Sequence, residues 1–289
     1  MIFRTLILLL FFSFGTTSLQ AGGGWPQPQG HGYFKLFQWW VIADQHFTDL
    51  GGIDPNVTNG IFNTGFYGEY GITNRLTGIV YLPFFSRAYF NNTVSGTTGE
   101  VLIPGEAINS FGDTDIGLQY GLITKGPVVW SATLRLGIPL GNSAGGSEGN
   151  LQTGDGEFNQ LLRFDASTSF RLGKLNSYAS VYGGYNNRTR GFSDELHFGA
   201  EVGVSFLKDH RLTTIFRLIG TRSMKNGSLN DGINNTSIFA NNSEFISLSP
   251  ELAYQLDDHW GVSASFASAI SGKIIFANPS YSVGVFYRW

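Results

Sequence analysis

Large apolar side chains recur at every second position over most of this chain. Residues 196–206 show the pattern clearly, with apolar side chains at Leu196, Phe198, Ala200, Val202, Val204 and Phe206. The positions between them are polar or small: His197, Gly199, Glu201, Gly203 and Ser205. Because a β-strand points successive side chains to opposite faces, this segment is predicted to be a strand with one apolar face and one polar face.

The same period-two pattern appears in about twelve runs, and none of them has the period of an amphipathic helix. Three runs, 33–47, 76–90 and 178–190, do not show which of their faces is the apolar one. Alternating runs of about ten residues that end in turn residues are typical of membrane-spanning barrels. The runs are 33–47, 62–72, 76–90, 116–122, 128–140, 158–172, 178–190, 196–206, 212–218, 246–256, 260–266 and 281–289.

The connections between these runs alternate between short and long. Twelve antiparallel strands whose two ends lie on one side need five turns on that side and six connections on the other. The short turns are 73–75, 124–127, 173–176, 208–210 and 257–259, and the looser connections are 48–57, 91–112, 141–157, 191–193, 223–242 and 271–277. This order predicts an all-β fold, a membrane-spanning antiparallel up-and-down β-barrel of about 12 strands with periplasmic termini. A soluble β-sandwich, the alternative, gives no reason for the strict alternation.

Composition supports an all-β chain and excludes several classes of function. Aromatic residues make up 15% of the 289 residues, charged residues only 13%, and 39 residues are glycine. Strands favour aromatic side chains, and tight turns use glycine. The formal net charge of −3 gives no basic surface for nucleic acid. Without cysteine, the chain has no disulfide, no thiolate metal site and no cysteine nucleophile.

The first 21 residues are predicted to be a Sec signal peptide. Arg4 precedes the apolar run 6–12, and mostly small or polar residues follow as far as Ala21, after which cleavage is expected. The apolar run is too short to cross a bilayer as a helix, which needs about 20 residues. We therefore expect a signal peptide at 1–21, a flexible Gly/Pro/Gln-rich lead-in at 22–32 and an outer-membrane β-barrel at 33–289. Export and the barrel pattern together predict the outer membrane of a Gram-negative bacterium, whose lipid is then a partner.

The last run, 281–289, keeps its large apolar and aromatic side chains on one face as far as Trp289. This ending resembles the closing strand of bacterial outer-membrane β-barrels, in which the assembly machinery reads a terminal aromatic residue. The resemblance implies that Tyr287 and Trp289 form the assembly signal and that the barrel-assembly machinery is a partner.

Three further segments form a pattern, 70–77 (YGITNRLT), 81–83 (YLP) and 111–120 (FGDTDIGLQY). This pattern resembles a group of Gram-negative outer-membrane transporter-like barrels that includes the phenol meta-pathway outer-membrane family. The group usually has Asp where this chain has Asn74, and the later strands match it only in style. The resemblance implies uptake of small, often aromatic or hydrophobic compounds, and it carries over no catalytic residue.

Charged residues on the polar faces of the predicted strands are the candidates for lining a pore. Acidic and basic residues occur there in similar numbers, and such charges are tolerated only where they face water or each other. We therefore expect opposed walls of charge and weak ion selectivity. The candidates are Glu69, Asp115, Arg135, Arg163, Asp165, Arg171, Glu195, His197, Glu201, Arg217, Glu251 and Arg288.

No catalytic residue, metal site or cofactor is predicted. The five histidines lack the spacing of metal ligands, and Ser205 and Ser263 share a face with His197 without a GxSxG motif. Asp113 and Asp115 fit either a Ca²⁺ site or a turn capped by aspartate.

The predicted function is that of a passive channel or uptake protein for small-molecule solutes, hydrophobic or aromatic ones included. Two alternatives stay open. One is a non-conducting structural or surface-binding barrel that acts through its outer loops 91–112 and 223–242. The other is a membrane-embedded hydrolase with His197 as its base.

Overall fold

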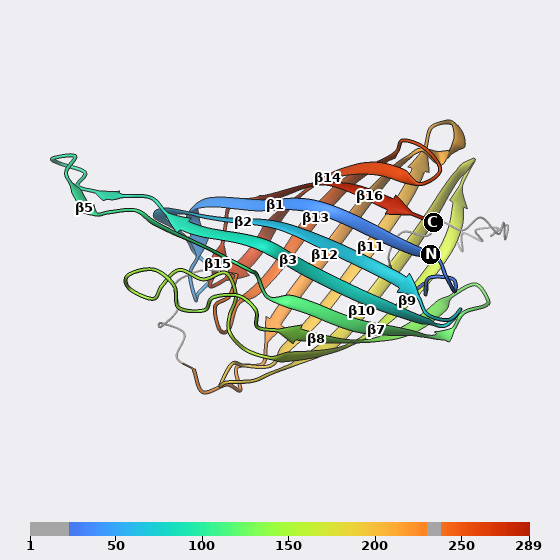
Figure 1. Ribbon diagram of the computed structural model, residues 1–289, viewed down its shortest axis with the longest axis horizontal. Coiled ribbons are helices and arrows are strands. Elements are labelled where there is room, and N and C mark those ends of the chain that lie inside the picture. Colours follow the sequence, from blue (N-terminus) through green and yellow to red (C-terminus); the bar gives the residue numbers. More distant parts are fainter. Residues whose placement is uncertain (1–22, 230–237) are drawn as a thin grey trace, which may run out of the picture.

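A computed structural model describes residues 23–229 and 238–289, so the predicted signal peptide at 1–21 and part of the loop 223–242 lie outside the described residues. Twelve of the described strands close into one antiparallel barrel, in which each strand pairs with the next and the last pairs with the first (Figure 1). They are β1 (Gly32–Phe47), β2 (Ile53–Gly71), β3 (Leu76–Phe90), β7 (Thr114–Ile123), β8 (Val129–Ile138), β9 (Asn159–Leu172), β10 (Leu175–Arg188), β11 (Glu195–Phe206), β12 (Leu212–Ser223), β13 (Glu244–Gln255), β14 (Trp260–Lys273) and β16 (Ser280–Arg288).

Short elements complete the described structure. Strands β4 (Thr93–Val94) and β5 (Val101–Ile103) form a hairpin of their own, β6 (Glu106–Ser110) pairs with β3, and β15 (Ile275–Phe276) pairs with β1. A three-residue 3₁₀ turn, η1 (Lys208–His210), separates β11 from β12. Within the described ranges, no helix is long and apolar enough to cross a membrane.

The barrel is polar inside and apolar outside, the reverse of a water-soluble protein. Side chains with less than 2% exposure include Thr77, Ser131 and Asp165, whereas Val181 and Phe216 on the outer face are 56% and 61% exposed. Apolar surface of this extent is stable against lipid hydrocarbon and unstable against water. The predicted membrane-spanning barrel of about twelve strands is confirmed.

The structure also settles the three runs of ambiguous phase. Tyr33 and Trp39 of β1 and Tyr81 of β3 line the lumen, and Tyr178 of β10 is buried. Alternation was hard to read there because both faces of these strands hold large side chains. On β1, for example, Leu36 is 53% exposed on the outer face between these inward-facing rings.

Both termini and the five short turns lie at one end of the barrel, the terminal end, and the six longer connections lie at the other, the loop end (Figure 1). Turn chemistry explains two of the short turns. Gly173 has a φ of +62° in the two-residue turn between β9 and β10, and Asp257 Oδ1 accepts hydrogen bonds from the amides of His259 and Trp260.

Several loop boundaries were wrong, because the strands continue in pairs beyond the apolar belt at the loop end. The expected loop 48–57 shrinks to five residues, since β2 begins at Ile53 and pairs with Phe47. The expected loop 271–277 is largely strand, with β14 reaching Lys273 and β15 paired to β1. The expected loop 91–112 contains β4, β5 and β6.

Burial and depth predict how substitutions on the outer face change stability. Val202 is 41% exposed near the middle of β11, so Val202→Arg is expected to lower the free energy of unfolding by about 2–4 kcal/mol by placing a charge in hydrocarbon. Equilibrium unfolding in phospholipid vesicles measures this loss.

Leu172→Arg is the matched control for Val202→Arg. Leu172 is also exposed, but it is the last residue of β9 beside a turn, where an arginine reaches the interface and costs only about 0–1 kcal/mol. Equal losses at Leu172 and Val202 would contradict the placement of the two residues at different depths.

Candidate functional site

Residues 23–31, which precede β1, cross the terminal end of the lumen. The amide of Gly24 donates to Ser167 Oγ at 2.7 Å, and the amide of Gln27 donates to Thr77 Oγ1 at 2.8 Å. The Gln27 side chain donates to Glu69 Oε2 at 2.7 Å. This segment, the N-terminal strap, therefore holds partners on β9, β3 and β2, on the side of the lumen that these strands enclose.

Glycines and an aromatic contact fit the N-terminal strap to the wall. A Cβ at Gly71 would lie 2.0 Å from the carbonyl oxygen of Pro28, so only glycine lets the strap pass this close. The ring of Trp25 packs edge-on against Tyr178 of β10, with centroids 5.9 Å apart. The predicted lead-in thus has specific contacts along its described length.

Connections at the loop end fold inward over the other opening. Leu151 and Thr153 of the loop between β8 and β9 are buried, as are Ala240 and Asn241 before β13. Ile238, next to them, lines the lumen itself. Both ends of the barrel are therefore partly covered by the chain's own segments.

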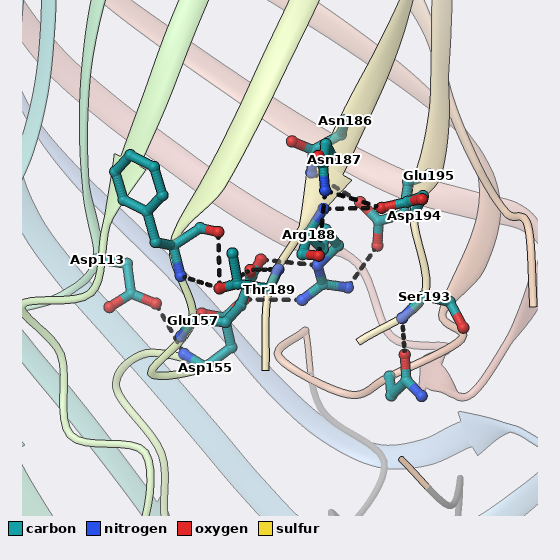
Figure 2. A network of polar contacts seen from close by, with 12 residues as sticks. Asp113, Asp155, Glu157, Asn186, Asn187, Arg188, Thr189, Ser193, Asp194 and Glu195 are labelled. Atoms are coloured by element: carbon teal, nitrogen blue, oxygen red, sulfur yellow. Dashed lines mark hydrogen bonds and ion pairs between the residues drawn. The ribbon is translucent and has the colours of Figure 1, made fainter. Parts of the chain in front are cut away.

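One arginine anchors the loop between β8 and β9 (Figure 2). Arg188, at the end of β10, makes ion pairs with Glu157 and Asp155 of that loop at 2.8 and 2.9 Å and with Glu195 of β11 at 2.8 Å. Its guanidinium also lies 4.3 Å from the ring centroid of Phe192. Three carboxylates share one buried cation, so the anchor depends on a single side chain.

Asp113 joins this network from the neighbouring connection. Its carboxylate accepts a hydrogen bond from the amide of Asp155 at 2.7 Å (Figure 2) and another from the amide of Gly141 at 3.0 Å. Burial and the nearby Asp113 carboxylate raise the pKa of Asp155 to about 7, and burial also raises the pKa of Asp113. The two acids therefore form a titrating pair at the base of the loop.

Between the two covered ends the lumen holds a cavity of about 710 Å³. Its wall on β1, β2, β3 and β16 is aromatic. Phe37 stacks on Tyr81 with centroids 5.4 Å apart and an 8° interplanar angle, and Tyr33 stacks on Phe286 at 5.6 Å. The aromatic side chains that line the cavity are Tyr33, Phe37, Trp39, Tyr67, Tyr81 and Phe286.

The facing wall, on β8 to β13, carries charge. Arg217 binds Glu201 through Nε and Glu251 through Nη1 at 2.5 Å, and Lys35 of β1 reaches Glu251 at 2.9 Å. Tyr178 donates to the same Glu201 at 2.5 Å. These groups form a ladder of alternating charge across the strands, in which each buried ion has a partner of opposite sign.

The structure brings most of the sequence candidates to one surface. Asp115 and Asp165 pair with Arg135 and Arg163 at 3.6 and 2.9 Å. Arg171 is exposed near the terminal end of β9. The candidates that line the cavity directly are Glu69, Arg135, Arg163, Glu201, Arg217, Glu251 and Arg288.

Sequence reasoning missed Lys35 and the aromatic wall, because the phase of the run 33–47 was unresolved. Neighbouring strands could have supplied it, since Lys35 lies opposite Phe286 and Tyr67, which have clear inward phases. Arg188 was missed because the phase of its own run, 178–190, was also unresolved. Asp155 and Glu157 were missed because they lie in a loop, where side chains do not alternate between two faces.

Glu195 and His197 lie together nearer the loop end, where His197 Nε2 is 2.9 Å from Glu195 Oε2. Ser205 is hydrogen-bonded to Thr213 at 3.0 Å, and no serine of residues 23–229 or 238–289 is hydrogen-bonded to His197. Within those residues, no group of three or more His, Asp or Glu side chains could hold a metal ion.

Trp289 closes the seam between the first and last strands. Its backbone exchanges hydrogen bonds with Gly32, and its indole nitrogen donates to the carbonyl of Gly30 at 2.8 Å. Its ring stacks on Phe34 and Tyr287, at centroid distances of 4.9 and 5.8 Å. The last two aromatic residues therefore lie where β16 meets β1 and the N-terminal strap.

Solved structures share this fold. An outer membrane channel from Pseudomonas putida F1 has a TM-score of 0.60 and 14% identity, with 94% of this chain and 100% of that chain covered. The beta domain of the Bordetella autotransporter BrkA has a TM-score of 0.50 and 12% identity, covering 90% of this chain and 100% of that chain. No family model and no curated protein matches the sequence. At these identities the likeness shows the fold alone, that of outer-membrane barrels.

Because of the Asp113–Asp155 pair, the stability of the loop between β8 and β9 is expected to depend on pH. The pKa of Asp155 rises from 3.8 to about 7 on folding, so the folded loop binds more protons than the unfolded loop. The contribution of Asp155 to the stability of the loop is therefore fully present below about pH 4 and is lost as the pH rises through about 7. Hydrogen exchange of residues 151–157, corrected for the intrinsic rate, is expected to show less protection at pH 8 than at pH 5.

Asp155→Asn separates the titration of this pair from that of any other group. An asparagine cannot ionise, so protection of residues 151–157 in the variant should change little between pH 5 and pH 8. If protection of residues 151–157 fell as much in the variant as in the natural protein, the pH effect would belong to another group.

Proposed function

We propose that this protein is a passive uptake channel in the outer membrane for small solutes. The observation that carries the proposal is a lumen cavity of about 710 Å³ inside a closed membrane-spanning barrel, lined by one aromatic wall and one charged wall. Paired charges of both signs support weak ion selectivity, because neither sign dominates the lining.

A route past the N-terminal strap supports the same proposal. The contacts of strap residues 23–27 lie on β2, β3, β7, β9 and β10, and Gly30 near the end of the strap accepts a hydrogen bond from Trp289. The cavity lining continues away from these contacts at the terminal end, at Arg211 and Gln255. Small solutes would leave toward the periplasm along this uncovered side.

A second candidate function is binding of a partner at the cell surface without conduction. The β4–β5 hairpin projects beyond the barrel at the loop end (Figure 1). Its apolar side chains are exposed, with Val94 at 53% and Leu102 at 63%. Exposed apolar groups on a projecting hairpin are a feature of contact surfaces.

Planar-bilayer recording and liposome swelling separate these two functions. The refolded mature chain is expected to conduct, and to admit small neutral solutes faster than protein-free liposomes. A chain that begins at Gly30 lacks most of the N-terminal strap and should conduct more, because the strap's contacts with Thr77, Ser167 and Glu69 are gone.

Deletion of residues 95–100 at the tip of the β4–β5 hairpin is the control for the loop end. This tip lies outside the cavity lining, so conductance should not change. No conductance and no swelling with either the full or the shortened chain would reject the channel and favour the surface-binding barrel.

A further inference from the structure

Arg135 is incompletely paired on the charged wall. Arg163 holds Asp165 with two nitrogens, at 3.0 and 2.9 Å, and Arg217 holds two carboxylates. Arg135 instead meets Asp115 at 3.6 Å, and its Nε is buried without a hydrogen-bond partner. Because a buried donor without an acceptor costs free energy, this guanidinium has capacity for one more anionic group.

A gap in the side-chain lining connects Arg135 to the aromatic wall. Arg135 lies opposite Gly117 of β7, which in turn lies opposite Ile79 of β3. The three atoms nearest to a Cβ at Gly117 would be the Leu134 carbonyl oxygen at 3.1 Å and the Cα and Cβ of Arg135 at 3.6 and 3.7 Å. Gly117 therefore places no side chain between the guanidinium and β3, where Ile79 lies directly opposite and Tyr81 lies two residues along the strand, both lining the cavity.

The rings across this gap are Tyr67 and Tyr81. They occupy paired positions on β2 and β3, both line the cavity, and Arg135 interacts electrostatically with both phenols. Phe37 backs Tyr81 in a near-parallel stack. Such a rigid aromatic surface favours a flat ring over a flexible chain, because aromatic pairs gain from stacked or edge-on geometry.

We propose that Arg135, Gly117, Tyr67 and Tyr81 form a binding site for a small aromatic carboxylate. The carboxylate would accept hydrogen bonds from Nε and a terminal nitrogen of Arg135 in the fork geometry that guanidinium groups favour. The ring would lie over Gly117 against the two tyrosines. This site rests on the proposed uptake function, and it narrows the solute from any small molecule to this class.

Calorimetric titration of the detergent-solubilised protein tests the site, with benzoate as the probe at pH 7.5. Benzyl alcohol keeps the ring and removes the charge, and acetate keeps the charge and removes the ring. Benzoate is expected to bind at least about tenfold more tightly than either, since a charged hydrogen bond to a half-buried guanidinium is lost with the alcohol. Equal binding of benzoate and benzyl alcohol would overturn the proposal.

Variants assign the effect to Arg135. Arg135→Gln should weaken benzoate binding at least about tenfold and leave benzyl alcohol unaffected. Because this change leaves Asp115 unpaired, the double variant Asp115→Asn with Arg135→Gln provides the same test without a lone buried carboxylate. Lys125→Gln, in the exposed turn between β7 and β8, is the matched control and should bind benzoate normally. Unchanged benzoate binding in both Arg135 variants would overturn the site.

Binding and transport fail in different ways. Benzoate binding that depends on Arg135, without solute flux in liposomes, would leave the site in place and reject the channel. Flux of small neutral solutes without benzoate binding would leave the channel in place and reject the site. Should the Arg135 variants not fold, the comparison of benzoate with benzyl alcohol on the natural protein still decides.

Discussion

The pairing of every backbone amide and carbonyl in a medium without water is the constraint on which this structure depends. A strand in hydrocarbon has no solvent to bind its free edge, so the sheet must close on itself. Here closure is made by β1, which pairs with β16 on one side and β2 on the other. Trp289 and the strap residue Gly30 extend that seam past the end of the ladder.

Closure also determines how charge is distributed. A charged group on the outer face would meet lipid, so ionisable residues collect inside, where they can meet only each other or water. The ladder from Tyr178 through Glu201, Arg217 and Glu251 to Lys35 follows from this requirement. Arg135 is an exception to this pairing, because the carboxylate of Asp115, at 3.6 Å, is too far away for a good hydrogen bond to its guanidinium. An incompletely paired cation in such an interior is a place where a ligand can supply what the protein does not.

Of the three segments that resemble the transporter-like barrels, 70–77 contains the short turn between β2 and β3 at the terminal end, whereas 81–83 and 111–120 connect β3 to the loop end. Pro83 interrupts the β2–β3 ladder at a bulge, and its carbonyl accepts a hydrogen bond from Gly112 at 2.8 Å. Asp113, next in the chain, then binds the amides of the loop between β8 and β9. Segments 81–83 and 111–120 therefore join the connection before β7 and the loop between β8 and β9 to one bulge in β3, and they bring Asp113 beside Asp155. Asp113 therefore binds backbone amides of another loop, at Gly141 and Asp155, and not those of its own turn as the capped-turn reading expected.

The sequence by itself determined the barrel, the strand number, the orientation of the ends and the inward face of most strands. It could do so because hydrocarbon imposes a period of two that survives along each strand, and because short and long connections must alternate. Only the tertiary structure decided what meets across the lumen. Lys35 reaches Glu251 from a strand 216 residues away, and the N-terminal strap folds back to Ser167. Contacts of this kind depend on barrel curvature and on side-chain reach across strands, neither of which has a period that a linear sequence can show.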